Sequence, residues 1–252
     1  MIGAEGLRWV ILLWTSIAAV TAGALLKIAA PYGRHARSGW GPAVPAPVAW
    51  MVMEAPSPVL MMTFFIAGHR HDAASTAFLA LWVGHYVYRS FVFPLLGAGR
   101  KAPMPLSVVL FAVVFNLVNG TLNGAWLFVL GPVRGPAWLA DPRFMSGFLV
   151  FLAGFFIHVR ADAGLRALRA PGAGGYTVPR GGLFERVSCP NYLGEIVEWC
   201  GYALLTWSIS ALSFAAWTAA NLVPRALAHH RWYGERFEDY PPERKAIVPG
   251  LL

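Results

Sequence analysis

The sequence predicts an all-α polytopic membrane protein, with about seven transmembrane helices that enclose a polar cavity. The chain of 252 residues is 57% hydrophobic and only 13% charged, whereas a soluble domain carries about 25% charged residues. The apolar residues are also gathered into long runs, and a helix needs about 20 such residues to cross a bilayer. Composition and spacing together exclude a soluble globular domain.

The apolar runs set the expected order of the helices. One run, roughly 193–227, is too long for a single span, and we expect a tight turn at its most polar point, Trp207–Ser210, to divide it into two helices. We expect one integrated membrane domain, in which residues 1–130 supply four helices and residues 131–252 supply three. The other runs, each close to the length of one span, cover residues 7–29, 47–67, 73–96, 105–130 and 145–169.

The formal charge of +8 is explained by membrane orientation, because the basic residues lie in short loops between apolar runs. With the N-terminus outside, the inner loops and the C-terminal tail hold thirteen Lys and Arg residues, and the outer segments hold four. We therefore expect an integral protein of the bacterial inner membrane or an equivalent membrane, with a cytoplasmic C-terminus. The same pattern gives no reason to expect a nucleic-acid partner.

The most distinctive stretch of the sequence, Gly181–Tyr202, carries a polar helix face. It opens as a loop broken by glycine and proline and continues as an apolar helix. Asn191, Glu195 and Glu198 fall at i, i+4 and i+7 of that helix and so share one face. Carboxylates at the mouth of a membrane helix are costly unless polar groups meet them, and they indicate a functional site.

A second polar face is predicted near the end of the fifth run, where His158, Asp162 and Arg166 recur every four residues. A solvated helix end explains Arg166 without further help. Asp162 lies deeper in the run, and it needs a polar partner or a ligand.

The loop 170–188 has the composition of an anion-binding segment. Its glycines allow backbone N–H groups to approach a phosphate closely. Tyr176 offers a ring for stacking, and Arg169 offers two parallel donors for a phosphate. No GxGxxG follows a strand and the sequence has no Walker motif, so a Rossmann domain is excluded. Further along the chain, a second basic face is formed by Arg225, His229 and Tyr233.

Glu54 is a carboxylate within the second apolar run. Pro56 and Pro58 follow it, and they break the local helix and free backbone carbonyls. One interpretation of Glu54 is a group that pairs with another helix for packing. The interpretation we favour is a carboxylic acid that its apolar surroundings keep protonated, so that it donates a hydrogen bond.

Tyr86 lies in the third run, directly after His85 and one turn before Arg89. A tyrosine in a membrane helix is usually an interfacial anchor. A histidine, a tyrosine and an arginine within five residues should instead face a wet or cofactor-filled interior. We expect His85 and Arg89 to support Tyr86 or to reach a cofactor from that side.

The fourth run contains three asparagines, Asn116, Asn119 and Asn123, at i, i+3 and i+7. Two interpretations stay open. The amides either hold helices together, with Gly120 and Gly124 allowing close approach, or they line a cavity.

These motifs together resemble the steroid 5α-reductase family. Asn191–Trp199, His229–Tyr233 and Phe237–Pro241 resemble its C-terminal domain, and Pro31–His35 extends the resemblance into the first half of the chain. Members of this family are integral-membrane, NADPH-dependent enzymes that saturate the 4,5 double bond of 3-oxo-4-steroids. The resemblance covers nearly the whole chain.

The resemblance implies a 3-oxo-5α-steroid 4-dehydrogenase whose helices enclose a cavity for cofactor and substrate, with residues 1–130 on the substrate side and residues 131–252 on the NADPH-binding side. Glu54 and Tyr86 would form the catalytic pair at the 3-oxo group. The mammalian members have glutamine where this chain has Met53, and asparagine where it has His158. We expect a steroid or another apolar enone as substrate, a monomer in the bilayer and no metal site. The residues implied to bind NADPH are Asn119, His158, Asp162, Arg169, Tyr176, Asn191, Glu195, Arg225, His229 and Tyr233.

Three alternatives stay open at this stage. A reductase of another lipid enone, enoyl or polyprenol substrate would use the same motifs. An isoprenylcysteine-type membrane methyltransferase would share the features at Asn191 and His229, but it would not need Glu54 or Tyr86. A lipid-binding protein without enzymatic activity would not need so many ionisable groups in its core.

Overall fold

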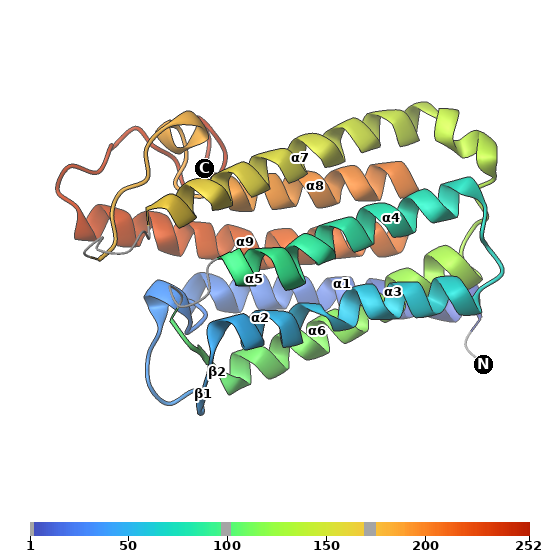
Figure 1. Cartoon of the computed structure of the whole chain (residues 1–252), viewed down its shortest axis with the longest axis horizontal. Coiled ribbons are helices and arrows are strands. Elements are labelled where there is room, and N and C mark those ends of the chain that lie inside the picture. The colour runs from blue at the N-terminus through green and yellow to red at the C-terminus, as the bar shows by residue number, and fades with distance from the viewer. Residues whose placement is uncertain (1–2, 97–101, 169–174) are drawn as a thin grey trace.

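The computed structural model of the protein describes residues 3–96, 102–168 and 175–252. Long helices run side by side along the molecule, with the N-terminus at one end and the C-terminus at the other (Figure 1). The predicted all-α fold class is confirmed. The only sheet among the described residues is a short antiparallel pair, formed by β1 (Ala43–Val44) and β2 (Met104–Pro105).

The first half of the chain forms four helical rods in its described residues. The first rod is uninterrupted, the second breaks where two prolines follow Glu54, and the third and fourth each contain a π-helical turn. Their elements are α1 (Ala4–Lys27), α2 (Ala46–Glu54), α3 (Pro56–Ala67), α4 (Ala73–Val87), the π-helical turn η2 (Tyr88–Val92), α5 (Phe93–Leu96), α6 (Leu106–Ala125) and the π-helical turn η3 (Trp126–Leu130).

The second half forms three longer elements, α7 (Pro142–Ala167), α8 (Pro190–Thr206) and α9 (Ile209–Arg236). The turn that we predict between the last two helices is confirmed. Trp207 adopts the left-handed conformation with φ 46°, and the Ser208 hydroxyl accepts a hydrogen bond from the backbone of Ala211. The short 3₁₀ turns of the described chain are η1 (Gly33–His35), η4 (Pro136–Ala140) and η5 (Gly182–Glu185).

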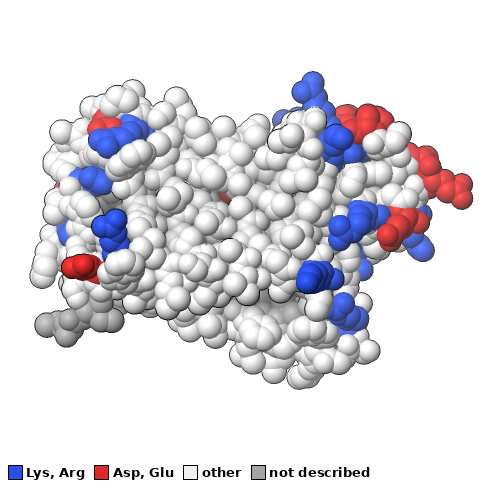
Figure 2. Space-filling view, turned by 180° about the vertical axis from the view of Figure 1, so that it is seen from behind, with Lys and Arg blue, Asp and Glu red and all other residues white. Residues whose placement is uncertain are grey.

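Four stretches of the described chain are long and apolar enough to cross a membrane, namely 4–27, 46–67, 106–130 and 142–167. On the face shown in Figure 2, charged side chains gather at the two ends of the molecule and leave the middle almost uncharged. The prediction of an apolar helical membrane protein is thus confirmed, whereas the count of seven spans stays a prediction. Of the remaining helices, α8 has only 17 residues. The rod with α4 and η2 carries Arg89, and α9 carries Arg225 among other charged residues, which lowers their mean hydropathy.

Glycines allow α7 and α8 to pack backbone against backbone. Gly147 and Gly154 on α7 meet Gly194 and Gly201 on α8, each pair spaced by seven residues. A Cβ atom on Gly194 would lie 2.5 Å from the backbone nitrogen of His158, and one on Gly154 would collide with the backbone of Glu198. Small residues are the usual means by which membrane helices approach closely. This seam sets the distance between the polar side chains of the two helices.

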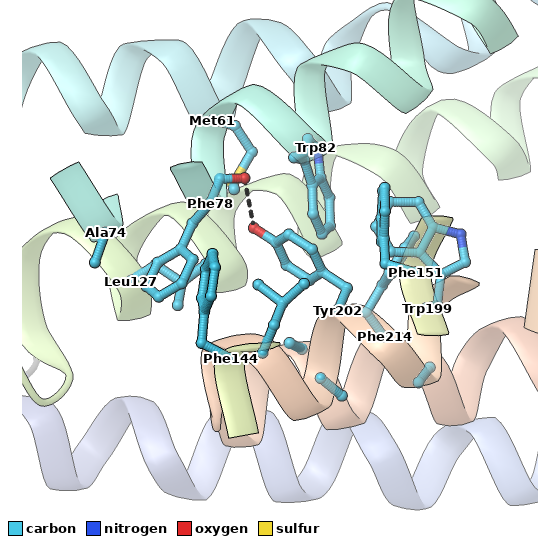
Figure 3. Packing of buried hydrophobic residues seen from close by; sticks show 14 of the residues in the cluster. Met61, Ala74, Phe78, Trp82, Leu127, Phe144, Phe151, Trp199, Tyr202 and Phe214 are labelled. Carbon is cyan, nitrogen blue, oxygen red and sulfur yellow. Dashed lines mark hydrogen bonds between the residues drawn. The ribbon is translucent and has the colours of Figure 1, made fainter. Parts of the chain in front are cut away.

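A cluster of aromatic side chains fills the core between α4, α7, α8 and α9 (Figure 3). Trp82 and Trp199 are almost fully buried, and their rings meet edge to face at 4.9 Å. The hydroxyl of Tyr202 donates a hydrogen bond of 3.1 Å to the backbone oxygen of Phe78, so α8 is also fixed to α4. Rigid aromatic packing therefore holds the helices on which the site residues lie.

The C-terminal tail docks against the segment that leads into α8. Val187 and Lys245 form an isolated parallel bridge, and the backbone N–H of Ser188 donates to the Lys245 carbonyl at 2.8 Å. Arg244 is almost fully buried and donates to the Pro179 carbonyl at 3.1 Å. The tail thus fixes the start of α8.

Replacement of Gly154 by alanine should destabilise the protein, because the added Cβ meets the backbone of α8. We expect a loss of about 1–3 kcal/mol or more, measured as a lower temperature of unfolding in detergent. Gly23→Ala is the matched control, since a Cβ there meets nothing within 4 Å. An unchanged unfolding temperature in Gly154→Ala would show that the two helices are not in backbone contact.

Candidate active site

A cavity of about 580 Å³ lies where residues from both halves of the chain meet. This volume is within the usual range of small-molecule and cofactor sites, about 300–1,000 Å³. Because both halves contribute, the predicted division into a substrate half and a cofactor half stays a prediction. The larger side chains of the wall are Tyr32, Arg34, Trp50, Arg89, Phe93, Met104, Asp162, Leu165, Arg166, Tyr176, Asn191, Tyr192, Arg225, His229 and Tyr233.

Arg89 is the cation around which the polar side chains gather. It lies in the π-helical turn η2, and its side chain is only 12% exposed. Its guanidinium nitrogens lie 3.9 Å from Glu54, 3.8 Å from Asp162 and 3.8 Å from Glu195. The guanidinium also lies over the Trp50 ring, 4.5 Å from its centre. One cation thus connects η2 with carboxylates of α2, α7 and α8.

Glu198 is fully buried and joins two histidines from other helices. One of its oxygens lies 2.7 Å from Nδ1 of His85, and the other lies 3.4 Å from Nδ1 of His158. The opposite nitrogen of His158, Nε2, lies 3.3 Å from Asp162. These contacts connect α4, α7 and α8. His85, His158 and Glu198 are not among the residues that line the cavity, so the proposed contact of His158 with a cofactor stays a prediction.

His85, His158 and Glu198 also form the one group of described residues whose ligand atoms lie close enough to hold a metal ion, within 4.8 Å of one another. The same nitrogens and oxygens already pair with each other through hydrogen bonds. Hydrogen bonding therefore accounts for the cluster, and the expectation of no metal site stays a prediction.

Asn116 connects the two side chains that the sequence suggests as a catalytic pair. Its Oδ1 accepts a hydrogen bond of 3.0 Å from the Tyr86 hydroxyl, and its Nδ2 donates to Glu54 at 3.3 Å. Nδ2 also lies 2.8 Å from the Met53 carbonyl, at the break between α2 and α3. Glu54 keeps 15% of its side chain exposed, while Tyr86 and Asn116 are buried. The structure thus brings Glu54 and Tyr86 together through one amide.

Asn119 and Asn123 lie on the same helix but make different contacts. Oδ1 of Asn119 accepts a hydrogen bond of 3.2 Å from the Trp14 ring, which joins α6 to α1. Asn123 donates to the backbone of its own helix at 3.0 Å. Neither side chain lines the cavity. The contact of Asn119 favours the helix-joining interpretation, and its assignment to a cofactor stays a prediction.

Arg225 lines the cavity and holds the loop before η1 in place. Its Nε donates to the Tyr192 hydroxyl at 3.1 Å, and its Nη2 donates to the Tyr32 carbonyl at 3.2 Å. The guanidinium lies 3.5 Å from the centre of the Tyr32 ring. Gly33 has φ +63°, a left-handed conformation that favours glycine, and a Cβ atom added there would lie 3.6 Å from Nη2 of Arg225. Arg225 therefore positions the wall of the cavity as well as contributing positive charge to it.

His229 bridges that loop and α8. Its Nδ1 lies 2.9 Å from Nε2 of His35, and its Nε2 lies 3.2 Å from the Tyr192 hydroxyl. Burial and, to a lesser degree, the nearby Arg225 lower the pKa of His35 to about 4. His35 is therefore neutral at pH 7.

Arg34 is a cavity-lining cation that sequence reasoning did not single out. Its guanidinium lies 4.4 Å from the centre of the Tyr233 ring, 4.8 Å from that of Trp232 and 5.2 Å from that of Tyr176. Its Nη1 atom is buried and has no hydrogen-bond partner among the described residues. Arg34 lies in Pro31–His35, one of the segments that resemble the steroid 5α-reductase family, and this position could have identified it as a site residue. Tyr176 and Tyr233, both predicted to bind the cofactor, frame this cation.

Asp162 and Asn191 face each other where α7 meets the start of α8. Asn191 donates to one oxygen of Asp162 at 3.2 Å, and both residues line the cavity. The other oxygen of Asp162 is buried and lies 3.3 Å from Nε2 of His158 and 3.8 Å from Nη1 of Arg89. Arg169, another predicted cofactor contact, lies outside the described residues. Glu195 contacts Arg89 and is not among the residues that line the cavity.

The site therefore fits a ligand that carries both anionic and hydrogen-bonding groups. Cations and aromatic rings line it around Arg34 and Arg225, and carboxylates gather at Arg89. Buried polar atoms normally have partners, so the Nη1 atom of Arg34, which has none among the described residues, indicates a group that a ligand would complete. Fold and site together define a polytopic membrane protein with an ionisable, cofactor-sized cavity.

Comparison with known proteins specifies this class further. A family model described as 3-oxo-5-alpha-steroid 4-dehydrogenase matches residues 102–252. The chain is 46% identical over 235 residues to the 3-oxo-5-alpha-steroid 4-dehydrogenase 1 of Bos taurus, with 90% of each chain covered. It is 44% identical over 232 residues to the steroid 5-alpha-reductase DET2 of Gossypium hirsutum, with 89% of each covered. The human 3-oxo-5-alpha-steroid 4-dehydrogenase 1 is 44% identical over 224 residues, 88% of this chain and 86% of that protein.

The chain belongs to the 3-oxo-5-alpha-steroid 4-dehydrogenase family. It is therefore a membrane oxidoreductase of steroid metabolism, and the family predicted from its motifs is confirmed.

The loop at His35 should loosen in mild acid. Because folding lowers the pKa of His35 from 6.5 to about 4, its stabilising effect is complete above pH 6.5 and is lost as the pH falls toward 4. We expect the unfolding temperature to fall over this range, with a smaller fall in His35→Gln. Equal pH profiles for the two proteins would contradict a buried neutral His35. His71→Gln, at an exposed histidine in the loop before α4, is the matched control.

Proposed function

We propose that the protein catalyses the NADPH-dependent reduction of the 4,5 double bond of 3-oxo-4-steroids, such as testosterone and progesterone, to 5α-reduced products. Relatives named as steroid 5-alpha-reductases support the reaction class. The single observation that carries the proposal is the network in which Asn116 joins Glu54 to Tyr86, and Arg89, which lines the cofactor-sized cavity, contacts Glu54 of this network. Two hydroxyl-type donors at one point suit a carbonyl oxygen that gains negative charge during the reaction.

Glu54 and Tyr86 would donate hydrogen bonds to the 3-oxo group. This draws electron density onto the oxygen and leaves C5 open to a nucleophile. Glu54 shares Arg89 with Asp162 and Glu195, so one cation faces three carboxyl groups. One positive charge cannot compensate three negative charges, so one of the three carboxyl groups should keep its proton. This supports the role of Glu54 as a hydrogen-bond donor.

The cofactor would be held by the polar residues of the cavity wall and would supply the hydride when bound. Arg34 and Arg225 offer positive charge for phosphate groups, and Tyr176 and Tyr233 offer rings. Asp162 and Asn191 offer an acceptor and a donor near Arg89. In the overall reaction the steroid gains a hydride at C5 and a proton at C4, and the 3-oxo group is restored.

Membrane orientation supports this arrangement. The loops that contribute to the cavity carry most of the basic residues, and such loops are normally cytoplasmic. The cavity would therefore face the cytosol, where the cofactor is available. The apolar steroid would enter from the bilayer, among the first few helices.

The activity is tested by incubating the purified protein with NADPH or NADH and a panel of steroid and lipid enones, with products identified by mass spectrometry. We expect 5α-reduced steroids, and much higher catalytic efficiency with NADPH because cationic side chains meet its 2′-phosphate. Reduction of a non-steroid enone alone would overturn the substrate class. Equal efficiency with both cofactors would overturn the proposed phosphate recognition.

The catalytic pair is tested by Glu54→Gln, Glu54→Leu and Tyr86→Phe. Glu54→Gln and Tyr86→Phe should retain steroid binding and lose about 100- to 1000-fold in single-turnover rate. Glu54→Leu should lose both steroid binding and turnover, with little change in NADPH affinity. The double mutant Glu54→Gln/Tyr86→Phe should fall by less than the product of the single effects, since both groups serve one oxygen. Wild-type turnover in Glu54→Leu would instead support the packing role of Glu54.

A further inference from the structure

Asn116 has only one possible orientation of its amide. Its Nδ2 atom lies 2.8 Å from the Met53 carbonyl and 3.2 Å from the Ala112 carbonyl. Both carbonyls are acceptors only, so the NH₂ group must face them. The amide oxygen therefore faces Tyr86.

This orientation fixes the direction of the Tyr86 proton. A phenol has one O–H, and Oδ1 of Asn116 can only accept, so Tyr86 donates its proton to Asn116. When no substrate is bound, the Tyr86 hydroxyl therefore donates its hydrogen bond to Asn116.

A ketone oxygen competes poorly for this proton, whereas an enolate oxygen competes well. Nitrogen donates electron density to an amide oxygen, which makes it a stronger acceptor than the oxygen of a ketone or an enone. Hydrogen bonds to an ionised oxygen are in turn roughly twice as strong as neutral ones. The Tyr86 hydroxyl should therefore remain hydrogen-bonded to Asn116 while the steroid is a ketone. It should donate to the steroid oxygen instead once negative charge develops on that oxygen.

We infer that Asn116 is a positioning residue that reserves the Tyr86 hydroxyl for the charged oxygen of the transition state. The inference rests on the proposed function. Substrate and product, which are both ketones, would be held at this point by Glu54 alone. Binding energy from Tyr86 would then appear only in the transition state, where it raises the rate instead of tightening the ground-state complex. Asn116 would take the hydroxyl back when the product ketone forms and so ease product release.

The test is equilibrium binding of progesterone to the protein saturated with NADP⁺, in which no turnover occurs. In Asn116→Leu the freed Tyr86 hydroxyl should bind the ketone, and the Kd should fall by about 2- to 10-fold. The double mutant Asn116→Leu/Tyr86→Phe should show no such gain. Asn123→Leu removes a buried amide about two helical turns away on the same helix, where Asn123 donates to the backbone of its own helix, and it should leave the Kd unchanged.

A second readout reports the hydrogen bond itself. The carbonyl stretching frequency of bound progesterone should not respond to Tyr86→Phe in the wild-type background. It should respond to the same change in the Asn116→Leu background, where the hydroxyl reaches the ketone. If Asn116→Leu does not fold, Asn116→Cys takes its place, because it is smaller and its sulfur is a weak acceptor.

An equal or higher Kd in the Asn116 variant would overturn this inference, as would a gain that persists without the Tyr86 hydroxyl. Wild-type protein that reduces steroid enones would leave the proposed function intact in either case. Failure of the wild type to bind or reduce any steroid enone would overturn the proposed function itself.

Discussion

The carboxyl groups in the interior of this protein depend on one buried cation, Arg89. Three carboxylates from α2, α7 and α8 lie within 4 Å of its guanidinium nitrogens, and the Trp50 ring covers it. Charged groups in a membrane interior are tolerated only when they meet partners. The π-helical turn η2 is what places Arg89 among them, and such turns often occur at functional sites. Arg89 thus fixes the positions of carboxyl groups on three helices and also forms part of the cavity wall.

Close helix packing and a helix break position the polar side chains of the site. Glycines let α7 approach α8 so closely that His158 reaches Glu198, and the same approach places Asp162 opposite Asn191. The two prolines after Glu54 interrupt the second rod, and the Met53 carbonyl beside this break receives the amide of Asn116. Backbone features that weaken isolated helices are here the means of positioning polar groups. The aromatic core then makes those positions rigid.

The helices could be predicted from the sequence because hydropathy and turn residues are local properties, as at Trp207–Ser210. The residues of the site could be named because their motifs resemble a family. Their pairings could not be predicted, since they depend on the relative register of helices far apart in the chain. Asn116 and Asn119 look equivalent in the sequence, yet one meets Tyr86 and the other meets Trp14. Arg34 was missed because a basic residue in a loop is also explained by membrane orientation.

The most direct test of the central role of Arg89 is the thermal stability of Arg89→Met alone and combined with Glu195→Gln. Removal of the cation leaves buried carboxylates uncompensated, which should cost about 3–5 kcal/mol. Neutralisation of Glu195 in that background should restore part of the lost stability, although Glu195→Gln should not stabilise the wild type. If Arg89→Met unfolds at the wild-type temperature, the buried carboxyl groups do not depend on this cation.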